Sequence, residues 1–472
     1  MIGRWLGRGA LTGVAVSVAL MMLVGVWRSP AAVPRLDGPG LLPKITWHPA
    51  TDLGVTVILW IATIIGTAAV AAGLLAVRHG WRPTLAPLLA GSVLAVAALA
   101  VAPPMGSTDS VDYAAYGRMA VLGHNPHVMT PGQFRATGDP VGELTPLEWD
   151  NLPSVYGPLA TAGQWAAAEL GNGSAAWTVF WLKVWNGLAF LGAALGLTTL
   201  AGADPARRTR VQVLWTLNPL MLWSLIGGAH VDVLAAAFAV AGLAVLGRSM
   251  TSGTRGLAGG LLLGAAAAVK APYALLGTGL GWALRRSRKS LAAAAAGGVA
   301  VLVTGYVIVG PDAVKAVLLR GRMPSWNTPW QLLVPLNHDH EPPGWLVTWG
   351  SLLLAAGVAA IFLRKLPEGP PWLRPALAVA LAWVLTTPVY YPWYEALVFP
   401  LIALAPASRL DWLQLLRALV ATVGCLPGVV FRLGDAWLKT SWLLTYAIPL
   451  TLLVLAVVLV AVTAKSPHNR DI

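Results

Sequence analysis

The sequence predicts an all-α polytopic membrane protein, and three observations carry this prediction. The 472 residues are 57% hydrophobic and only 11% charged, whereas about 25% of the residues of an ordinary soluble domain are charged. The mean hydropathy is +0.69. Apolar runs of about 20 residues recur along the chain, and each is long enough to cross the hydrocarbon core of a bilayer. Soluble enzymes, secreted disulfide scaffolds and disordered proteins are therefore excluded.

The apolar runs define the predicted crossings. The run at 256–284 is interrupted by Lys270-Ala271-Pro272. Proline blocks a continuous helix and the residue before it favours extended backbone, so two short helices are predicted to meet there. The total is about 12–14 transmembrane helices. The other runs lie at about 9–27, 53–77, 84–102, 175–200, 211–228, 231–247, 289–309, 344–363, 372–389, 394–408, 413–431 and 441–463.

The distribution of basic residues predicts the orientation. If both termini are cytoplasmic, most Arg and Lys residues, Arg210 and Arg417 among them, fall in cytoplasmic segments, and most acidic residues fall outside. The net charge of +13 is then explained by membrane orientation, so no nucleic-acid partner is expected. The long segments 28–52, 103–174 and 310–343 lie on the outer side, and functional residues concentrate on such loops. The single cysteine, Cys425, excludes an intrachain disulfide and a cysteine-based metal cluster.

An acidic motif follows the third apolar run. Asp109 and Asp112 are three residues apart, so a helix would place both carboxylates on one face, with Tyr113 and Tyr116 on or beside it. Ser107 or Thr108 is suited to cap this helix. A carboxylate above the membrane surface could act as a general base towards a sugar hydroxyl. The alternative is a pair of solvated acids that stabilise the start of a helix.

Two further motifs follow in the same loop. Gly123-His124-Asn125-Pro126 has the composition of a turn. Tyr156-Gly157-Pro158-Leu159 opens an apolar segment at 158–170 that is too short to cross a bilayer as a helix. We expect this segment to lie in the interface or to re-enter the membrane, closing a cavity beside the acidic helix.

The order of these motifs resembles that of the GT-C glycosyltransferases, and most closely the bacterial polyprenol-phosphomannose-dependent α-(1→6)-mannosyltransferases. The resemblance covers roughly residues 85–410. It rests on Asp109 four residues before Tyr113, then on the Gly-His-Asn-Pro turn and the Tyr156 motif. Later elements agree with it: Asn218-Pro219, His230-Val231-Asp232, Lys270-Ala271-Pro272-Tyr273 and Thr387-Pro388 followed by Tyr391-Pro392-Trp393-Tyr394.

The resemblance implies a GT-C-like fold with extracytoplasmic loop helices in a bacterial plasma membrane. Residues 1–84 would form N-terminal transmembrane helices, 85–410 a catalytic core and 411–472 C-terminal transmembrane helices. The implied reaction moves a sugar, mannose by resemblance, from a polyprenyl-phosphate donor to a hydroxyl of a lipid-linked or envelope glycan, with inversion and with Asp109 as base. No cofactor is expected. Asp112, Tyr113 and Tyr116 would be a second acid or acceptor-binding residues.

Several side chains are candidates for the donor phosphate. Lys270 lies in an apolar run, where an ionisable residue is costly and commonly functional; the alternative is that it snorkels to the surface. Arg320 and Arg322 could grip a phosphate with planar guanidinium groups, or could be ordinary solvated loop charges. Arg118 and His230 are further candidates for the phosphate.

Aromatic and polar residues near these positions are candidates for sugar binding, although interfacial anchoring also explains such aromatic residues. The predicted sugar-binding set is Tyr156, Asp232, Trp326, Asn327, Tyr391, Trp393 and Tyr394. His230 and Asp232 could equally form a structural hydrogen-bonded pair.

The sequence also contains features of a zinc site and of a transporter. The side chains of His338-Asp339-His340-Glu341 suit zinc, but consecutive residues rarely converge on one ion, so no metal site is predicted. A lipid-linked sugar flippase or exporter would also fit the helix count and the outer carboxylates. Transporters often have repeated halves and charges at mid-membrane, and neither is prominent in this sequence.

Overall fold

The structure is a computed structural model, and it describes residues 1–38, 41–47, 51–246, 253–320, 324–334, 342–429 and 435–465. Over these residues the regular secondary structure is entirely helical. Among the described residues, six helices are long and apolar enough to cross a membrane, which confirms the predicted all-α polytopic class. They are α1 (Ile2–Trp27), α2 (Asp52–Arg78), α7 (Ala175–Leu200), α13 (Arg288–Val309), α15 (Gly344–Lys365) and the segment Lys439–Lys465, which ends in α20 (Ile448–Lys465).

Several other apolar runs form shorter or bent helices. The segments Pro219–Gly227 and Asp232–Leu246 make a bent pair with an angle of 115°, which counts as a seventh crossing if the pair is one span. Hydropathy counts apolar residues and does not register such breaks, so the 12–14 predicted crossings exceed the number of long helices. The shorter apolar helices are α3 (Leu85–Val101), α11 (Gly253–Val269), α16 (Leu373–Thr386) and the segment Pro392–Leu404.

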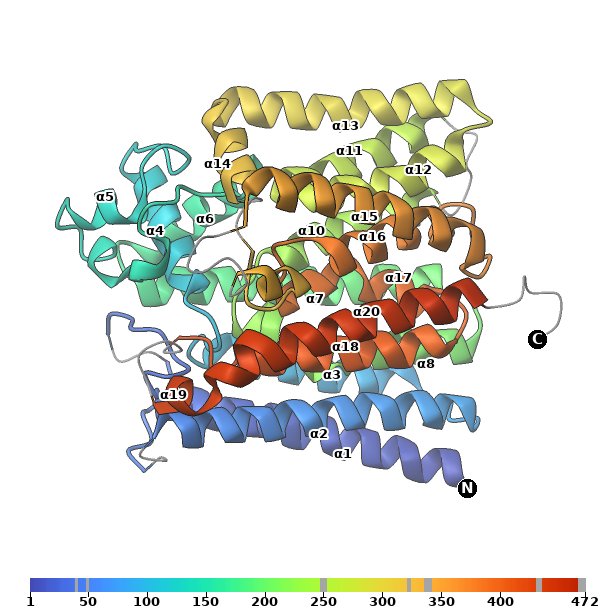
Figure 1. Ribbon diagram of the computed structural model, residues 1–472, viewed down its shortest axis with the longest axis horizontal. Coiled ribbons are helices and arrows are strands. Elements are labelled where there is room, and N and C mark those ends of the chain that lie inside the picture. Colours follow the sequence, from blue (N-terminus) through green and yellow to red (C-terminus); the bar gives the residue numbers. More distant parts are fainter. Residues whose placement is uncertain are drawn as a thin grey trace.

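Figure 1 shows the long helices running side by side along one direction, with α4, α5 and α6 gathered at one end of the bundle. We call this the loop end. The start of α1 and the end of α20 lie at the opposite end. The elements of the loop end are α4 (Asp109–Val121), α5 (Pro131–Arg135), η1 (Gly142–Leu144), η2 (Leu147–Trp149) and α6 (Pro158–Gly171).

The remaining elements connect and cover the bundle. The two helices predicted to meet at Lys270 are confirmed: α11 ends at Val269 and α12 (Gly277–Leu284) follows a turn, η4 (Ala271–Leu276). The others are α8 (Pro205–Leu214), α9 (Pro219–Met221), η3 (Leu222–Gly227), α10 (Asp232–Leu246), α14 (Asp312–Arg320), η5 (Pro329–Leu333), η7 (Pro392–Leu397), α17 (Phe399–Leu404), α18 (Arg409–Cys425), α19 (Asp435–Trp442) and η8 (Leu443–Ala447).

Helix α6 is the short apolar segment predicted at 158–170, and it packs against α4 and α7. Two glycines permit this packing. A Cβ at Gly117 would lie 2.2 Å from the carbonyl oxygen of Gln164, and one at Gly157 would lie 2.2 Å from that of Ala268. Gly157 also donates its N–H to the carbonyl of Val269, at 3.0 Å. Gly117 therefore allows α4 to approach α6, and Gly157 allows the start of α6 to approach the end of α11.

Two arginines that the sequence assigned to cytoplasmic segments are buried inside the bundle. Arg210 forms a bidentate ion pair with Asp411, with N–O distances of 2.6 and 2.8 Å. Arg417 pairs with Glu395, whose other oxygen accepts from Gln414 at 2.6 Å. Buried charges are retained only when paired and hydrogen-bonded, which both pairs satisfy. A count of basic residues cannot distinguish such a pair from a loop charge.

Candidate active site

Asp109 is the first residue of α4, at the loop end of the bundle. Its N–H donates to the Oγ of Ser107 at 3.1 Å; the N-cap is Thr108, one of the two residues that the sequence predicted, although its side chain makes no capping hydrogen bond. The Asp109 side chain is 16% exposed. The carboxylate therefore sits at the positive end of a helix and remains accessible from the loop end.

Two phenol groups hold one oxygen of the Asp109 carboxylate. The hydroxyl of Tyr113 donates to Oδ2 at 3.2 Å, and the hydroxyl of Tyr156 lies 3.4 Å from the same atom. The two hydroxyls are 3.0 Å from each other. Burial, together with the charge of Asp109, raises the pKa of both phenols well above 10, so they remain protonated donors. Among the described residues Oδ1 has no hydrogen-bond partner, which leaves it available to accept a proton.

His230 approaches the same carboxylate oxygen from the turn before α10. Its Nδ1 lies 2.5 Å from the carbonyl oxygen of Ser224, and a carbonyl can only accept, so Nδ1 carries a proton. Its Nε2 lies 3.7 Å from Oδ2 of Asp109. The turn is held by Asn186, which donates to the His230 carbonyl at 3.0 Å, and by Ala229 in the left-handed conformation, with φ of 61°. This strained turn fixes the imidazole beside Asp109.

Lys270 and Asp232 form a buried ion pair close to Tyr156. The Lys270 ammonium lies 2.8 Å from each carboxylate oxygen of Asp232. It also lies 3.8 Å from the centre of the Tyr394 ring and 5.8 Å from that of Tyr156. The structure thus excludes the snorkelling alternative for Lys270, which is 7% exposed. The predicted link between His230 and Asp232 is not formed, because Asp232 binds Lys270.

A wall of stacked rings lies beside His230 and Lys270. The Trp393 ring lies 3.6 Å from the His230 ring at an interplanar angle of 13°, and 4.7 Å from the Tyr391 ring at 1°. The turn of Pro392 at the start of η7 places these rings and Tyr394 together. Flat aromatic faces of this kind are suited to contact with a sugar ring.

Asp112 lies one helical turn after Asp109 and has a different environment. It is 3% exposed, and neither carboxylate oxygen has a hydrogen-bond partner among the described residues. Burial, with a smaller effect of the Asp109 charge, raises its pKa well above 3.8 and favours the neutral acid. Two carboxyl groups in unlike environments at one site can take different roles in proton transfer.

A cavity of about 60 Å³ lies beside Asp109 and Asp112, and His230, Asp232 and Lys270 are not among its lining residues. It is lined by both acids, by the hydroxyl-bearing ring of Tyr156 and by the aromatic wall. The complete lining is Asp109, Asp112, Tyr113, Tyr116, Trp149, Leu152, Pro153, Val155, Tyr156, Val389, Tyr391, Trp393 and Tyr394. We call it the Asp109 cavity.

Other predicted site residues lie elsewhere. Arg118 forms an ion pair with Asp139 at 3.0 Å and does not line the Asp109 cavity. Arg320 ends α14, and Arg322 lies outside the described residues. Trp326 is half-buried and Asn327 is 4% exposed; their segment binds the chain just before Tyr391, since Ser325 donates to the carbonyl of Tyr390 at 2.9 Å.

The Gly-His-Asn-Pro turn holds the loop in place. Asn125 donates to the carbonyl of Val309 at 2.8 Å, which ties the loop to the end of α13. His127 lies 3.1 Å from both the Ser154 carbonyl and the Thr161 hydroxyl. Burial lowers the pKa of His127, so the neutral imidazole is favoured. This motif positions the segment that carries Tyr156.

Three residues at this site were not predicted from the sequence. Trp149 lines the Asp109 cavity, and Ser224 and Asn186 orient His230. Asn186 is a polar residue within an apolar run, which is a signal that could have been followed. Within the described residues no three His, Cys, Asp or Glu side chains form a group that could hold a metal ion. The His338–Glu341 stretch considered for zinc lies outside them.

Comparison with known proteins identifies the family. A family model described as "Alpha-(1->6)-mannopyranosyltransferase, N-terminal domain" matches residues 10–286, which is more than half of the chain. The chain is 26% identical to alpha-(1->6)-mannopyranosyltransferase A of Mycobacterium tuberculosis over 392 residues, covering 75% of this chain and 71% of that protein. It is 28% identical to alpha-(1->6)-mannopyranosyltransferase B of Corynebacterium glutamicum over 153 residues, 31% of this chain and 25% of that protein.

No solved structure matches the chain. The matched range contains Asp109, Tyr156, His230 and Lys270, which are the polar groups of the site. The family is one of transferases, so the flippase or exporter alternative has no support from these comparisons. With its membrane-spanning helices, the chain belongs to the alpha-(1->6)-mannopyranosyltransferase family and is a membrane mannosyltransferase.

Proposed function

We propose that the protein transfers mannose from a polyprenyl-phosphate donor to a hydroxyl of a lipid-linked or cell-envelope glycan at the extracytoplasmic face of a bacterial plasma membrane. Asp109 removes the proton from the acceptor hydroxyl. The hydroxyl oxygen attacks the anomeric carbon, the bond to phosphate breaks, and polyprenyl phosphate leaves with the bonding electron pair. Attack opposite the leaving group inverts the anomeric configuration.

The observation that carries this proposal is the environment of Asp109. One carboxylate oxygen is fixed by two protonated phenols, and the residue lines the cavity. A base held in this way is oriented before the acceptor arrives, which lowers the entropic cost of reaching the reactive geometry. The aromatic wall opposite it supplies a surface for the sugar ring.

Lys270 is the group we assign to the leaving phosphate. Its ammonium is fixed by Asp232 and lies over the rings of Tyr156 and Tyr394. A cation held rigidly near the developing phosphate charge stabilises the transition state. Asp232 then has a positioning role, since it keeps the ammonium charged in a buried place.

The proposed sidedness rests on the charges at the two ends of the bundle. The start of α1, with Arg4 and Arg8, and the end of α20 lie opposite the loop end. An excess of basic residues marks the cytoplasmic side of a membrane protein. The loop end, with the Asp109 cavity, is therefore assigned to the outside. The two relatives are named as alpha-(1->6)-mannopyranosyltransferases, which supports an α-(1→6) linkage in the product.

The donor class is tested with purified protein in proteoliposomes. Polyprenyl-phosphate mannose and a nucleotide-activated mannose are each offered with a short α-mannoside acceptor. We expect an extended mannoside from the lipid-linked donor alone. Transfer from the nucleotide donor alone would overturn the proposed donor, and a product that keeps the anomeric configuration of the donor would overturn the inverting mechanism.

A further inference from the structure

A second and much larger cavity lies at the loop end, on the other side of the segment that leads to Asp109. Its volume is about 620 Å³, within the range of roughly 300–1,000 Å³ typical of ligand sites. It is bounded by residues between 28 and 38 after α1 and by Leu41, by residues 100–104 at the end of α3, and by the first turns of α7. It shares no lining residue with the Asp109 cavity. We call it the α7 cavity.

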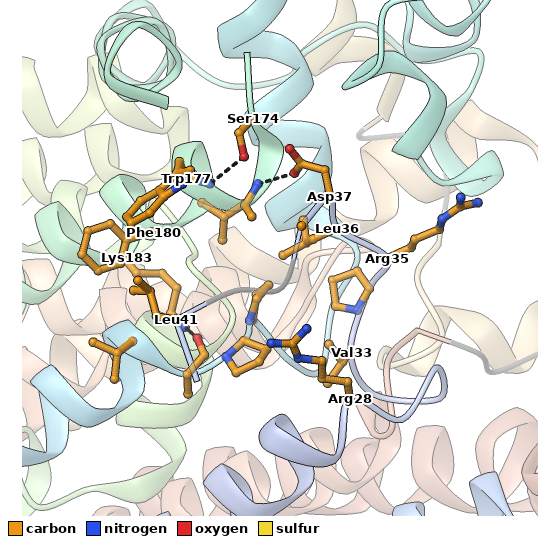
Figure 2. A pocket seen from close by; sticks show the side chains of 18 of the residues that line it. Arg28, Val33, Arg35, Leu36, Asp37, Leu41, Ser174, Trp177, Phe180 and Lys183 are labelled. Carbon is orange, nitrogen blue, oxygen red and sulfur yellow. Dashed lines mark hydrogen bonds between the residues drawn. The ribbon is translucent and has the colours of Figure 1, made fainter. Parts of the chain in front are cut away.

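Figure 2 shows how the labelled side chains surround the α7 cavity. Trp177, Phe180 and Lys183 come from α7 on one side, and Arg28, Val33 and Leu36 lie on the other. The lining is mostly apolar. Trp177 is 48% exposed, so the cavity opens on a surface that presents aromatic and aliphatic groups.

Lys183 is the polar group at the inner side of this cavity. It lies within a helix apolar enough to span the membrane, and it is only 1% exposed, so it does not snorkel to water. Its ammonium donates to the carbonyl of Ala102 at 2.6 Å. An ammonium has three donors, and among the described residues the other two have no partner. A buried, partly satisfied cation beside a cavity is a strong attraction for an anion.

The other charges of the lining leave a positive excess. Asp37 is the acidic residue of the lining, and its carboxylate already accepts a hydrogen bond: Oδ1 accepts from the N–H of Ala176 at 2.8 Å (Figure 2). Arg28 donates to the carbonyl of Leu42 at 2.8 Å, and Arg35 is exposed at the rim. Three basic side chains therefore oppose one tied carboxylate. Basic pockets between transmembrane helices are suited to lipid phosphate groups.

We propose that the α7 cavity binds a phosphate-bearing membrane lipid, as a site distinct from the Asp109 cavity. The phosphate contacts Lys183 and the arginine rim, and the hydrocarbon chain lies against Trp177 and Phe180. Both an isoprenoid phosphate and an anionic glycerophospholipid carry this chemistry. Pro104 of the lining is five residues before Asp109, at most about 18 Å along the chain. The inference rests on this cavity and holds whether or not Asp109 is the base.

The test is photo-crosslinking in nanodiscs of phosphatidylcholine. The probes are photoactivatable polyprenyl phosphate, phosphatidylglycerol and uncharged diacylglycerol, and labelled peptides are identified by mass spectrometry. We expect labelling of segments 28–38 and 174–183 by one or both phosphate lipids, and about tenfold less by diacylglycerol, since a hydrogen bond to a charged group contributes about this factor. The phosphate lipid that labels these segments shows whether the cavity binds an isoprenoid phosphate or a glycerophospholipid.

Matched variants make the result specific. Lys183→Met removes the buried charge and is expected to lower labelling about tenfold, and Arg35→Gln at the exposed rim is expected to lower it less. Arg286→Gln, an exposed arginine far along the chain, is the control and should leave labelling unchanged. Three results would overturn the proposal. The first is equal labelling by diacylglycerol, and the second is unchanged labelling of Lys183→Met in a protein with the thermal midpoint of the wild type. The third is displacement of the lipid probes by glycerol phosphate alone, which has no hydrocarbon chain.

Discussion

The Nε2 atom of His230 lies 3.7 Å from Oδ2 of Asp109, and Nδ1 of the same ring is fixed by the carbonyl of Ser224. The two residues come from the start of α4 and from the turn before α10. The imidazole therefore presents one nitrogen to the carboxylate in a single orientation. Together with Tyr113 and Tyr156, it surrounds one oxygen of Asp109, a residue that lines the cavity.

Tyr156→Phe is expected to lower kcat by about ten- to a hundredfold while the fold is kept. The variant removes a phenol donor that orients the Asp109 carboxylate, and a hydrogen bond to a charged group contributes about 1.5–3 kcal/mol. Mannosyl transfer by purified protein measures this change. Tyr446→Phe, an exposed tyrosine near the start of α20, is the control. Unchanged kcat in Tyr156→Phe would show that the phenol does not act on the base.

His230→Phe distinguishes the role of the ring nitrogens of His230 from the role of its stacking surface. The phenyl ring can still stack on Trp393 but presents no nitrogen to Asp109. We expect kcat to fall by about tenfold or more and KM for the donor to change much less. His124→Gln, at an exposed position of the loop, should match the wild type. A change confined to KM would instead assign His230 to sugar binding alone.

The Lys270–Asp232 pair is expected to behave as a unit in stability measurements. Lys270→Met leaves a buried carboxylate without its partner, and removing one member of a buried pair costs about 3–5 kcal/mol. Adding Asp232→Asn removes that carboxylate, so the double variant should recover most of the thermal midpoint. It should still transfer mannose poorly, because the proposed phosphate cation is gone. Additive losses of stability in the double variant would contradict the pairing.

Asp112 predicts a pH dependence of stability. Burial raises the pKa of its carboxyl in the folded protein above that in the unfolded chain. The folded state then binds this proton more tightly, so its contribution is present at acid pH and is lost as the pH rises from about 4 through the folded pKa. Thermal midpoints of the wild type and Asp112→Asn, measured from pH 4 to 8, should converge at acid pH, with the variant more stable at high pH.

The control for this series is Glu169→Gln, which removes an exposed carboxyl from α6. It should follow the wild type at every pH, because it removes a carboxyl that is exposed to solvent and leaves Asp112 in place. A constant difference between the wild type and Asp112→Asn across the pH range would contradict burial of a neutral acid.

The sequence could predict the local part of the site and not its tertiary partners. Asp109 and Tyr113 are four residues apart, so a helix brings them together whatever the rest of the fold does. Tyr156 reaches Asp109 only because Gly157 lets its segment approach the end of α11. The cation at Lys270 was predicted, but its partner Asp232 lies on another helix and depends on packing.

The fold class was likewise predictable, while the course of individual helices was not. Apolar composition requires helices in a bilayer, which is why the polytopic class holds. The bend of 115° before α10 depends on the left-handed backbone of Ala229, a conformation that a hydropathy profile does not contain. That same bend places His230 at Asp109, so a feature decisive for the site was among the least visible in the sequence.

The most direct test of the account is the rate of mannosyl transfer by Asp109→Asn, with Glu169→Gln as the matched control. Asparagine is nearly isosteric with aspartate but cannot act as a carboxylate base. The account predicts that kcat falls by about 10²–10⁴-fold, while donor affinity and thermal midpoint stay at the values of the control. Wild-type kcat in Asp109→Asn would contradict the assignment of Asp109 as the base.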